Sequence, residues 1–188
     1  MKLEIQKRET GKKGIANKLR RDGYVPAVLY GFNQVGTPIY LKADEIGAVL
    51  RNMKPGLLAT TLFELHEGTK KHKAIVKDVQ YHVTGYDLVH IDFMQIAEDK
   101  PVTVNVPIQV TGAADCVGIK LGGFLRQVMR TVKVSCLPKD IPQSLTIDVA
   151  ALDVGQSKTL ADIAISPHIR LLTKNGVVAA IGKKAGAA

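Results

Sequence analysis

Short segments in which apolar and polar residues alternate recur along the chain, and they constrain the fold more than any other feature. Alternation over about four to eight residues is typical of a strand with one buried face. Proline and glycine interrupt these segments, as in residues 54–56 and 138–142. The chain is therefore predicted to be mostly β (α+β). The predicted strands are residues 1–8, 25–30, 37–41, 60–65, 73–81, 88–93, 102–110, 130–136, 145–149, 169–172 and 177–181.

Two segments have helical rather than strand spacing. Near the start, Ile15 and Leu19 lie four residues apart, Thr10 is a suitable N-cap, and Gly23 suits the left-handed turn after a helix. A helix beginning at residue 11 or 12 is expected. In residues 43–53, four apolar side chains share one helical face: Ile46, Val49, Leu50 and Met53.

The domain organisation follows from the order of these elements. Short strands with two or three helices predict a small β-barrel in the first half. Residues 98–101 (EDKP) follow a completed strand and are the best boundary, dividing the chain into 1–97 and 98–188. The second half is predicted to be a β-rich domain without a strong helix. Residues 112–123 and 152–161 are predicted loops, and 183–188 a frayed tail.

Composition excludes several classes of protein. With 188 residues, 46% hydrophobic and 23% charged, the chain can bury a substantial core. No apolar run approaches the roughly 18 residues of a membrane span, and the N-terminus lacks the apolar region of a secretory signal. Cys116 and Cys136 are too few for a disulfide framework, so buried free thiols and a cytoplasmic location are expected.

The positive charge is concentrated near the N-terminus. Residues 1–21 contain eight Lys or Arg against two Glu, which accounts for six of the nine net charges. Lys12 and Lys13 fall in the first turn of the expected helix, where the helix dipole disfavours cations. Cations at positions that the helix dipole disfavours, with no gain to the fold, indicate a functional site. Here the positive charge favours RNA binding. The alternative is a solvated helix face.

A second candidate surface lies on the strands of the first half. His90 and Asp92 share one face of their strand, and Gln80 lies on the opposite parity to Ile75 and Val79. A carboxylate is able to accept from a guanine amino group or a ribose hydroxyl in a shallow minor groove. The alternative is a solvated strand face with a His–Asp hydrogen bond. For Tyr30, a core position and a hydroxyl that reaches RNA remain equally open.

No catalytic arrangement is found, so the chain is not predicted to be an enzyme. Gly118, Gly122 and Gly123 lack the spacing of a phosphate-binding loop, and turn glycines are the simpler interpretation. The five histidines and two cysteines show no metal-ligand spacing. No cofactor and no metal are expected.

Long motifs throughout the chain resemble one known family. The motifs are GKKGIANKLRRDGYVPAVLYG at 11–31, KDVQYHV at 77–83, VHIDF at 89–93, PVTVNVPIQVTG at 101–112 and CLPKDIPQSLTIDV at 136–149. With these motifs the chain resembles the bacterial large-subunit ribosomal proteins that bind 5S rRNA, in their long, two-domain Ctc (general stress protein) form. Ile91 stands where the family usually has valine, and the acidic tail of some long forms is absent.

The resemblance implies a fold, a partner and a set of contacts. The first domain is expected to resemble the anticodon-binding barrel of glutaminyl-tRNA synthetase and to bind the loop E region of 5S rRNA in the 50S subunit. The second domain is expected to meet neighbouring rRNA or ribosomal proteins, and the protein to be a monomer off the ribosome. The alternative is a tRNA-binding or stress-response module that acts off the ribosome.

The expected roles are divided among ten residues. Arg8 and Arg20 are expected at phosphates or in a groove. The remaining cations supply backbone charge, and the polar strand residues face the minor groove. These other residues are Lys12, Lys13, Lys18 and Arg21 for the charge, and Tyr30, Gln80, His90 and Asp92 for the groove.

Overall fold

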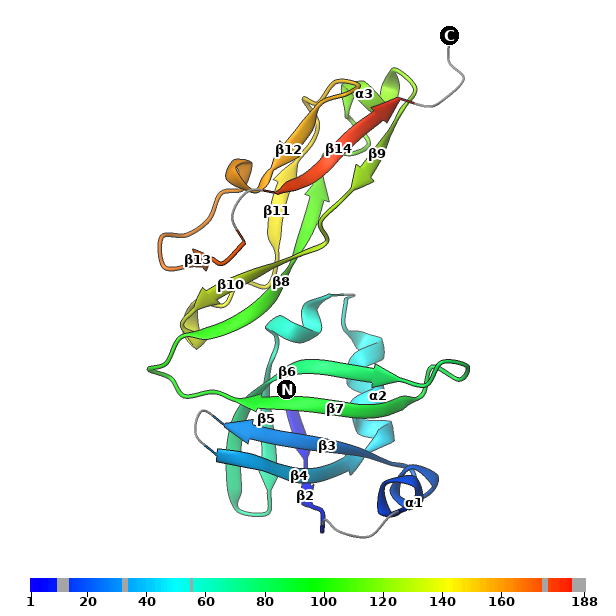
Figure 1. The fold of residues 1–188 in the computed structure, drawn as a ribbon, viewed down its shortest axis with the longest axis vertical. Helices are drawn as coiled ribbons and strands as arrows, with labels where there is room; N and C mark the ends of the chain where they lie inside the picture. Colours follow the sequence, from blue (N-terminus) through cyan, green and yellow to red (C-terminus); the bar gives the residue numbers. More distant parts are fainter. Residues whose placement is uncertain (10–13, 32–33, 55, 174–175, 184–188) are drawn as a thin grey trace. The chain divides into compact units, whose positions relative to one another are not determined.

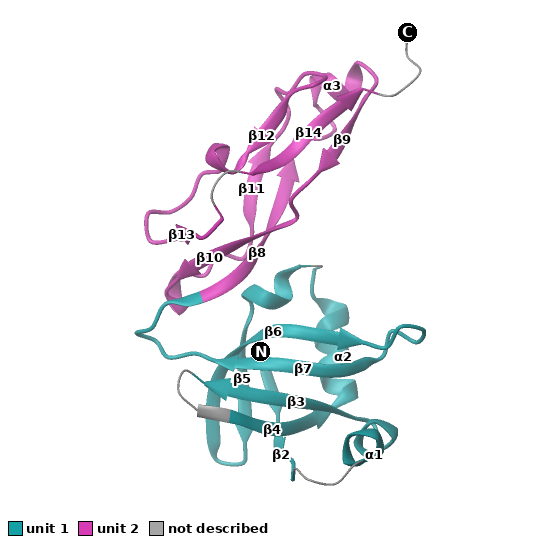
Figure 2. Cartoon of the chain, viewed as in Figure 1, with its two compact units in different colours: residues 1–102 teal, residues 103–188 magenta. Residues whose placement is uncertain are grey.

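Strands dominate the structure, a computed structural model, and the prediction of a mostly β chain is confirmed (Figure 1). The chain divides into two compact units, residues 1–102 and 103–188 (Figure 2). The predicted boundary segment, 98–101, lies just before this division. The structure describes residues 1–9, 14–31, 34–54, 56–173 and 176–183.

A seven-stranded sheet forms the first unit. Its strands, in spatial order, are β1 (Lys2–Glu4), β5 (Leu62–Glu67), β6 (Lys70–Tyr81), β7 (Leu88–Gln95), β3 (Tyr24–Gly31), β4 (Gln34–Lys42) and β2 (Gln6–Lys7). The strands at the two edges, β1 and β2, are separated in the chain only by Ile5. Because a one-residue link holds the two edges close together, the sheet curls into a nearly closed barrel. This confirms the predicted barrel.

The barrel interior is filled by the apolar residues that alternate along its strands. Phe63 of β5 and Phe93 of β7 are fully buried and meet edge to face, with ring centroids 6.2 Å apart. Ile46 of helix α2 (Ala43–Asn52) is also fully buried against this core, which confirms the predicted second helix. A short 3-10 helix, η1 (Leu57–Thr60), follows it.

Helix α1 (Ile15–Arg21) is short and buries no residue completely. Ile15 and Leu19 are half-buried, and the helix packs beside β3. It ends as predicted, because Gly23 adopts the left-handed conformation with φ of 81°. The described helix begins after Gly14, and the proposed cap, Thr10, lies outside the described residues.

A β-bulge in β6 corrects the predicted strand faces. Val76 pairs with Phe93, and Asp78 pairs with Asp92, so Lys77 is an extra residue with no opposite partner. Val76 therefore shares the inner face with Val79, whereas Ile75 lies on the other face; the predicted grouping of Ile75 with Val79 is wrong. Simple alternation cannot reveal a bulge, because the extra residue reverses the parity of everything before it.

The second unit contains two further sheets. A four-stranded sheet has the order β11 (Leu145–Asp148), β8 (Val102–Thr111), β10 (Thr131–Cys136), β13 (Arg170–Leu171). A three-stranded sheet has the order β12 (Ser157–Thr159), β14 (Val177–Lys183), β9 (Gly123–Gln127). The remaining elements are α3 (Val117–Lys120), η2 (Pro138–Asp140) and η3 (Leu160–Asp162).

The two predicted loops of this half are more ordered than expected. Residues 112–123 contain α3, and 152–161 contain β12 and η3. Gly118 packs so closely that an added Cβ would lie 2.9 Å from both the carbonyl carbon of Asp153 and a methyl carbon of Ile181. This glycine therefore serves close packing, which excludes the phosphate-loop alternative. Cys116 and Cys136 are buried free thiols, as predicted.

Candidate nucleic-acid interface

The four polar strand residues predicted as contacts lie on one outer face of the barrel. Gln80 of β6 pairs with His90 of β7, and Asp92 follows two residues after His90 on the same face. On the next strand, β3, Val28 pairs with Asp92 and Tyr30 pairs with Met94. Directly paired residues point to the same side of a sheet, so Tyr30, Gln80, His90 and Asp92 share this outer face.

His90 and Asp92 form a polar pair at the centre of this face. The imidazole Nδ1 lies 2.9 Å from the Asp92 carboxylate, and the two side chains are 22% and 35% exposed. Donation from Nδ1 to the carboxylate fixes the orientation of the ring and leaves Nε2 outside this contact. The pair therefore presents a carboxylate oxygen and an imidazole nitrogen, both positioned before any partner arrives.

Tyr30 is partly buried beside this pair. Burial raises the pKa of its hydroxyl, and the negative charges of Asp92 and Asp78 raise it further. The hydroxyl therefore stays protonated in neutral solution and remains a donor. Of the two alternatives for Tyr30, the structure places it on the outer face rather than in the barrel core.

Arg20 joins the basic helix to the polar face. Its Nε donates to the backbone carbonyl of Val89, 3.1 Å away, and its Nη1 donates to Oδ1 of Asn17, 2.9 Å away. The guanidinium is thus held at the start of β7, one residue from His90. Because a guanidinium carries five N–H donors, most of them remain available.

The other cations are distributed around the helix and the barrel edge. Lys18 and Arg21 are exposed on α1, and Arg21 Nε donates to the Asn17 carbonyl at 3.4 Å. Lys12 and Lys13 lie outside the described residues. Both described cations are free to move toward a phosphate.

Arg8 lies just after β2, where its backbone N–H donates to the Pro38 carbonyl at 2.9 Å. Pro38 pairs with Val28, which pairs with Asp92, so Arg8 continues a row that crosses the outer face. Its Nε is buried and has no hydrogen-bond partner among the described residues. An unpaired buried donor is costly, and a bound acceptor would relieve that cost.

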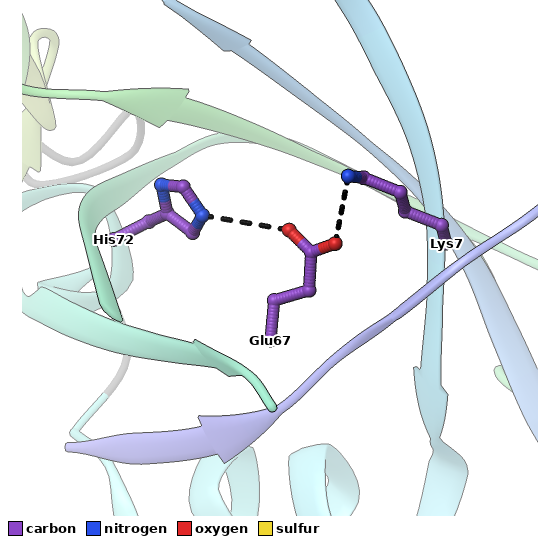
Figure 3. A network of polar contacts seen from close by, with 3 residues as sticks. All are labelled: Lys7, Glu67 and His72. Atoms are coloured by element: carbon purple, nitrogen blue, oxygen red, sulfur yellow. Dashed lines mark ion pairs between the residues drawn. The ribbon is translucent and has the colours of Figure 1, made fainter. Parts of the chain in front are cut away.

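A nearby cation, Lys7, has a structural partner instead. Figure 3 shows Glu67 of β5 between Lys7 of β2 and His72 of β6, with Lys7 Nζ 2.8 Å from one carboxylate oxygen and His72 Nε2 3.6 Å from the other. The hydrogen bond from Lys7 lowers the pKa of Glu67, and His72 lowers it further. This ion pair links the two edge regions of the barrel, so Lys7 has a structural role.

The lowered pKa of Glu67 predicts a small pH-dependent stabilisation. A carboxylate with a lowered folded-state pKa stabilises the fold above its ordinary pKa, and that contribution is lost as pH falls through the folded-state value. Because the Lys7 side chain is largely exposed and solvent screens the pair, we expect Glu67→Gln to cost at most about 1 kcal/mol at neutral pH. Urea unfolding of both proteins at neutral and strongly acidic pH measures this, and a difference that persists unchanged in acid would contradict it.

An open hollow of about 650 Å³ lies beside Arg20 and was missed at the sequence level. Its lining includes Arg51 of α2, His82 and Tyr86 after β6, and the carboxylates of Asp44 and Asp87. Sequence separations of more than twenty residues between the three elements hide this grouping, since only the folded barrel brings α1, α2 and the end of β6 together. Arg51 adds a second guanidinium to the lining beside Arg20, and Asp44 and Asp87 add two acidic residues.

The described part of the chain gives no indication of other chemistry. No three histidine, cysteine or acidic side chains there are grouped as metal ligands. Among the same residues, no helix has the length and apolar character to cross a membrane.

Comparison with known proteins defines the class of the chain as ribosomal. Two family models match in sequence: "Ribosomal L25p family" over residues 3–93 and "Ribosomal protein TL5, C-terminal domain" over residues 101–185. The protein named large ribosomal subunit protein bL25 from Chlamydia muridarum is 43% identical over 173 residues, covering 92% of this chain and 94% of that protein. Its counterpart from Chlamydia trachomatis serovar L2 is 44% identical with the same coverage.

The chain belongs to the ribosomal L25p family, in the two-domain form that carries the TL5 C-terminal domain. The resemblance drawn from its motifs is therefore confirmed. The prediction that the chain is not an enzyme is also confirmed, because this is a family of structural ribosomal proteins.

Proposed function

We propose that the chain is a structural protein of the large ribosomal subunit in the cytoplasm, and that its first unit binds 5S rRNA in the loop E region. The observation that carries this proposal is the hydrogen bond from Arg20 to the Val89 carbonyl, because it fixes the basic helix next to His90. The cations of α1 and the polar residues of the outer face thus form one continuous surface. The bL25 relatives support a ribosomal setting.

The chemistry of the face suits the minor groove of folded RNA. The Asp92 carboxylate is an acceptor for guanine amino groups or ribose 2′-hydroxyls, and the Tyr30 hydroxyl is a donor. Gln80 provides both a donor and an acceptor. The cations Lys18 and Arg21, together with Lys12 and Lys13 of the preceding segment, neutralise phosphates and position the face without reading the base sequence.

The footprint extends across several strands. Gln80 lies on β6 and Arg8 lies just after β2, four strand-to-strand steps away in the sheet order. Neighbouring strands are about 4.8 Å apart, so the surface spans roughly 19 Å along the curved sheet. Arg20 is held at β7, three steps from β2 in the same order, so Arg8 and Arg20 are expected to contact different parts of one RNA helix.

Salt dependence tests whether the binding is electrostatic in the way proposed. The affinity for 5S rRNA should fall linearly with salt on logarithmic axes, with a slope of about 0.7 to 0.9 per phosphate neutralised. Filter binding or fluorescence anisotropy over a salt series measures the slope. An affinity that hardly changes with salt would contradict the proposal.

Two substitutions separate positioning from recognition. Asp92→Ala should weaken binding to 5S rRNA with an intact loop E and leave an unrelated duplex unaffected, whereas Lys13→Ala should weaken both RNAs alike. Competition between the two RNAs measures each effect.

If the protein is instead an off-ribosome module, it will be recovered with tRNA rather than with salt-washed 50S particles.

A further inference from the structure

The three-stranded sheet of the second unit has an outer face that the proposed 5S rRNA site does not use. Phe124 and Arg126 of β9 pair with Gly182 and Ala180 of β14, and Ser157 of β12 pairs with Ala180. These five residues therefore share one face. The opposite face is buried, since Ala179 and Ile181 of β14 belong to the apolar core of this unit.

The ring of Phe124 covers Gly182 with one of its two faces. A Cβ placed on Gly182 would lie 2.6 Å from Cζ of the ring and 2.8 and 3.2 Å from the two Cε atoms. If the ring met this point edge-on in its plane, both Cε atoms would be clearly farther away than Cζ. The near-equal distances show contact with the ring face, an arrangement in which an aromatic side chain shields a glycine on the neighbouring strand.

The other face of the ring is open. Phe124 is 50% exposed, although an aromatic side chain of this size is ordinarily largely buried. Shielding of Gly182 accounts for the ring face that is covered and does not account for the exposed one. An open aromatic face held rigidly against a sheet is the feature on which unpaired bases stack in single-strand-binding proteins.

One cation, Arg126, shares the face of the ring. The other two cations of the three strands lie on the opposite parity, because Lys158 pairs with Ala179 and Lys183 pairs with Gly123. None of the three strands contains an acidic residue. Arg126 is exposed, and among the described residues it has neither an ion pair nor a hydrogen bond through its side chain. Two residues along a strand separate its Cα from that of Phe124 by about 7 Å, so its guanidinium can reach the phosphate next to a stacked base.

We propose that this face of the second unit, formed by Phe124, Arg126, Ser157, Ala180 and Gly182, is a second RNA-binding surface. An unpaired base stacks on the open face of Phe124, and Arg126 binds its phosphate. This surface is independent of the 5S rRNA site proposed for the first unit.

The absence of tryptophan from the chain makes a direct test possible. Phe124→Trp keeps an aromatic ring over Gly182 and introduces a single indole whose fluorescence reports stacking. The full chain is titrated with an unpaired RNA of about 12 nucleotides, within the site sizes of single-strand binders. Leu172→Trp, at another exposed apolar position of the same unit, is the matched control.

We expect saturable quenching of the indole in Phe124→Trp and none in Leu172→Trp. Phe124→Leu, which keeps apolar cover over Gly182 but removes the ring, should weaken binding about tenfold, and Arg126→Ala should lower the salt slope by about 0.7. These measurements are made on chains that also carry Arg20→Ala, which weakens binding at the first unit. Unaltered 5S rRNA affinity in Phe124→Leu with Arg20 intact confirms that the sites are separate.

Two results would overturn the proposal. One is an unquenched indole in Phe124→Trp at RNA concentrations that saturate the chain. The other is an indole whose fluorescence changes when ribosomal proteins stripped of RNA are added and does not change with the oligonucleotide. That result would assign the face to a protein partner. If Phe124→Leu loosens the sheet, the quenching experiment still decides the question.

Discussion

Replacing Arg20 with alanine is expected to weaken binding to 5S rRNA by about 1–3 kcal/mol, roughly 5- to 150-fold. The substitution removes a guanidinium that is held in place by the Val89 carbonyl and the Asn17 side chain. A side chain already fixed in position loses little conformational entropy when it binds, so its contribution is larger than that of a mobile lysine. Fluorescence anisotropy with labelled 5S rRNA measures the effect.

Arg21→Ala is the matched control for this experiment. Arg21 is the next residue, carries the same charge and makes only a 3.4 Å contact within its own helix. Its loss should mainly reduce the salt slope, with a smaller effect on affinity. Equal losses from the two substitutions would show that Arg20 contributes charge alone. Circular dichroism of both variants tests whether α1 remains intact.

Replacing Phe93 with alanine is expected to destabilise the first unit by about 3–5 kcal/mol. Phe93 is fully buried, meets Phe63 edge to face and lies directly behind the polar face, between Asp92 and Met94 in β7. Its removal leaves a cavity in the barrel and loses the aromatic contact. Urea unfolding followed by circular dichroism measures the change in the free energy of unfolding.

Met94→Ala is the control for Phe93→Ala, because the two residues are adjacent on β7 and point to opposite faces. Met94 is only half-buried, so its truncation should cost considerably less. A similar cost for both would contradict the assignment of inner and outer faces. The same variants show whether RNA binding depends on the stability of the barrel. Without urea, where the protein is fully folded, Phe93→Ala should retain the specificity for loop E.

Local patterns predicted the elements that depend on neighbouring residues. The end of α1 follows from Gly23, whose left-handed conformation a side chain would disfavour. The face shared by His90 and Asp92 follows from their spacing along one strand. By contrast, the bulge at Lys77 has no local signal, so the faces of residues before it were assigned incorrectly.

The amino-acid sequence by itself determined the β-rich class, the two helices of the first half, the family and the charge that favours RNA. These properties depend on composition, motifs and short-range periodicity. Only the tertiary structure decided that Arg20 lies beside His90, that Arg51 and His82 line a hollow next to it, and that the ring of Phe124 covers Gly182. Strand pairing and barrel closure bring such residues together, and contacts between distant segments leave no mark on the local pattern of either one.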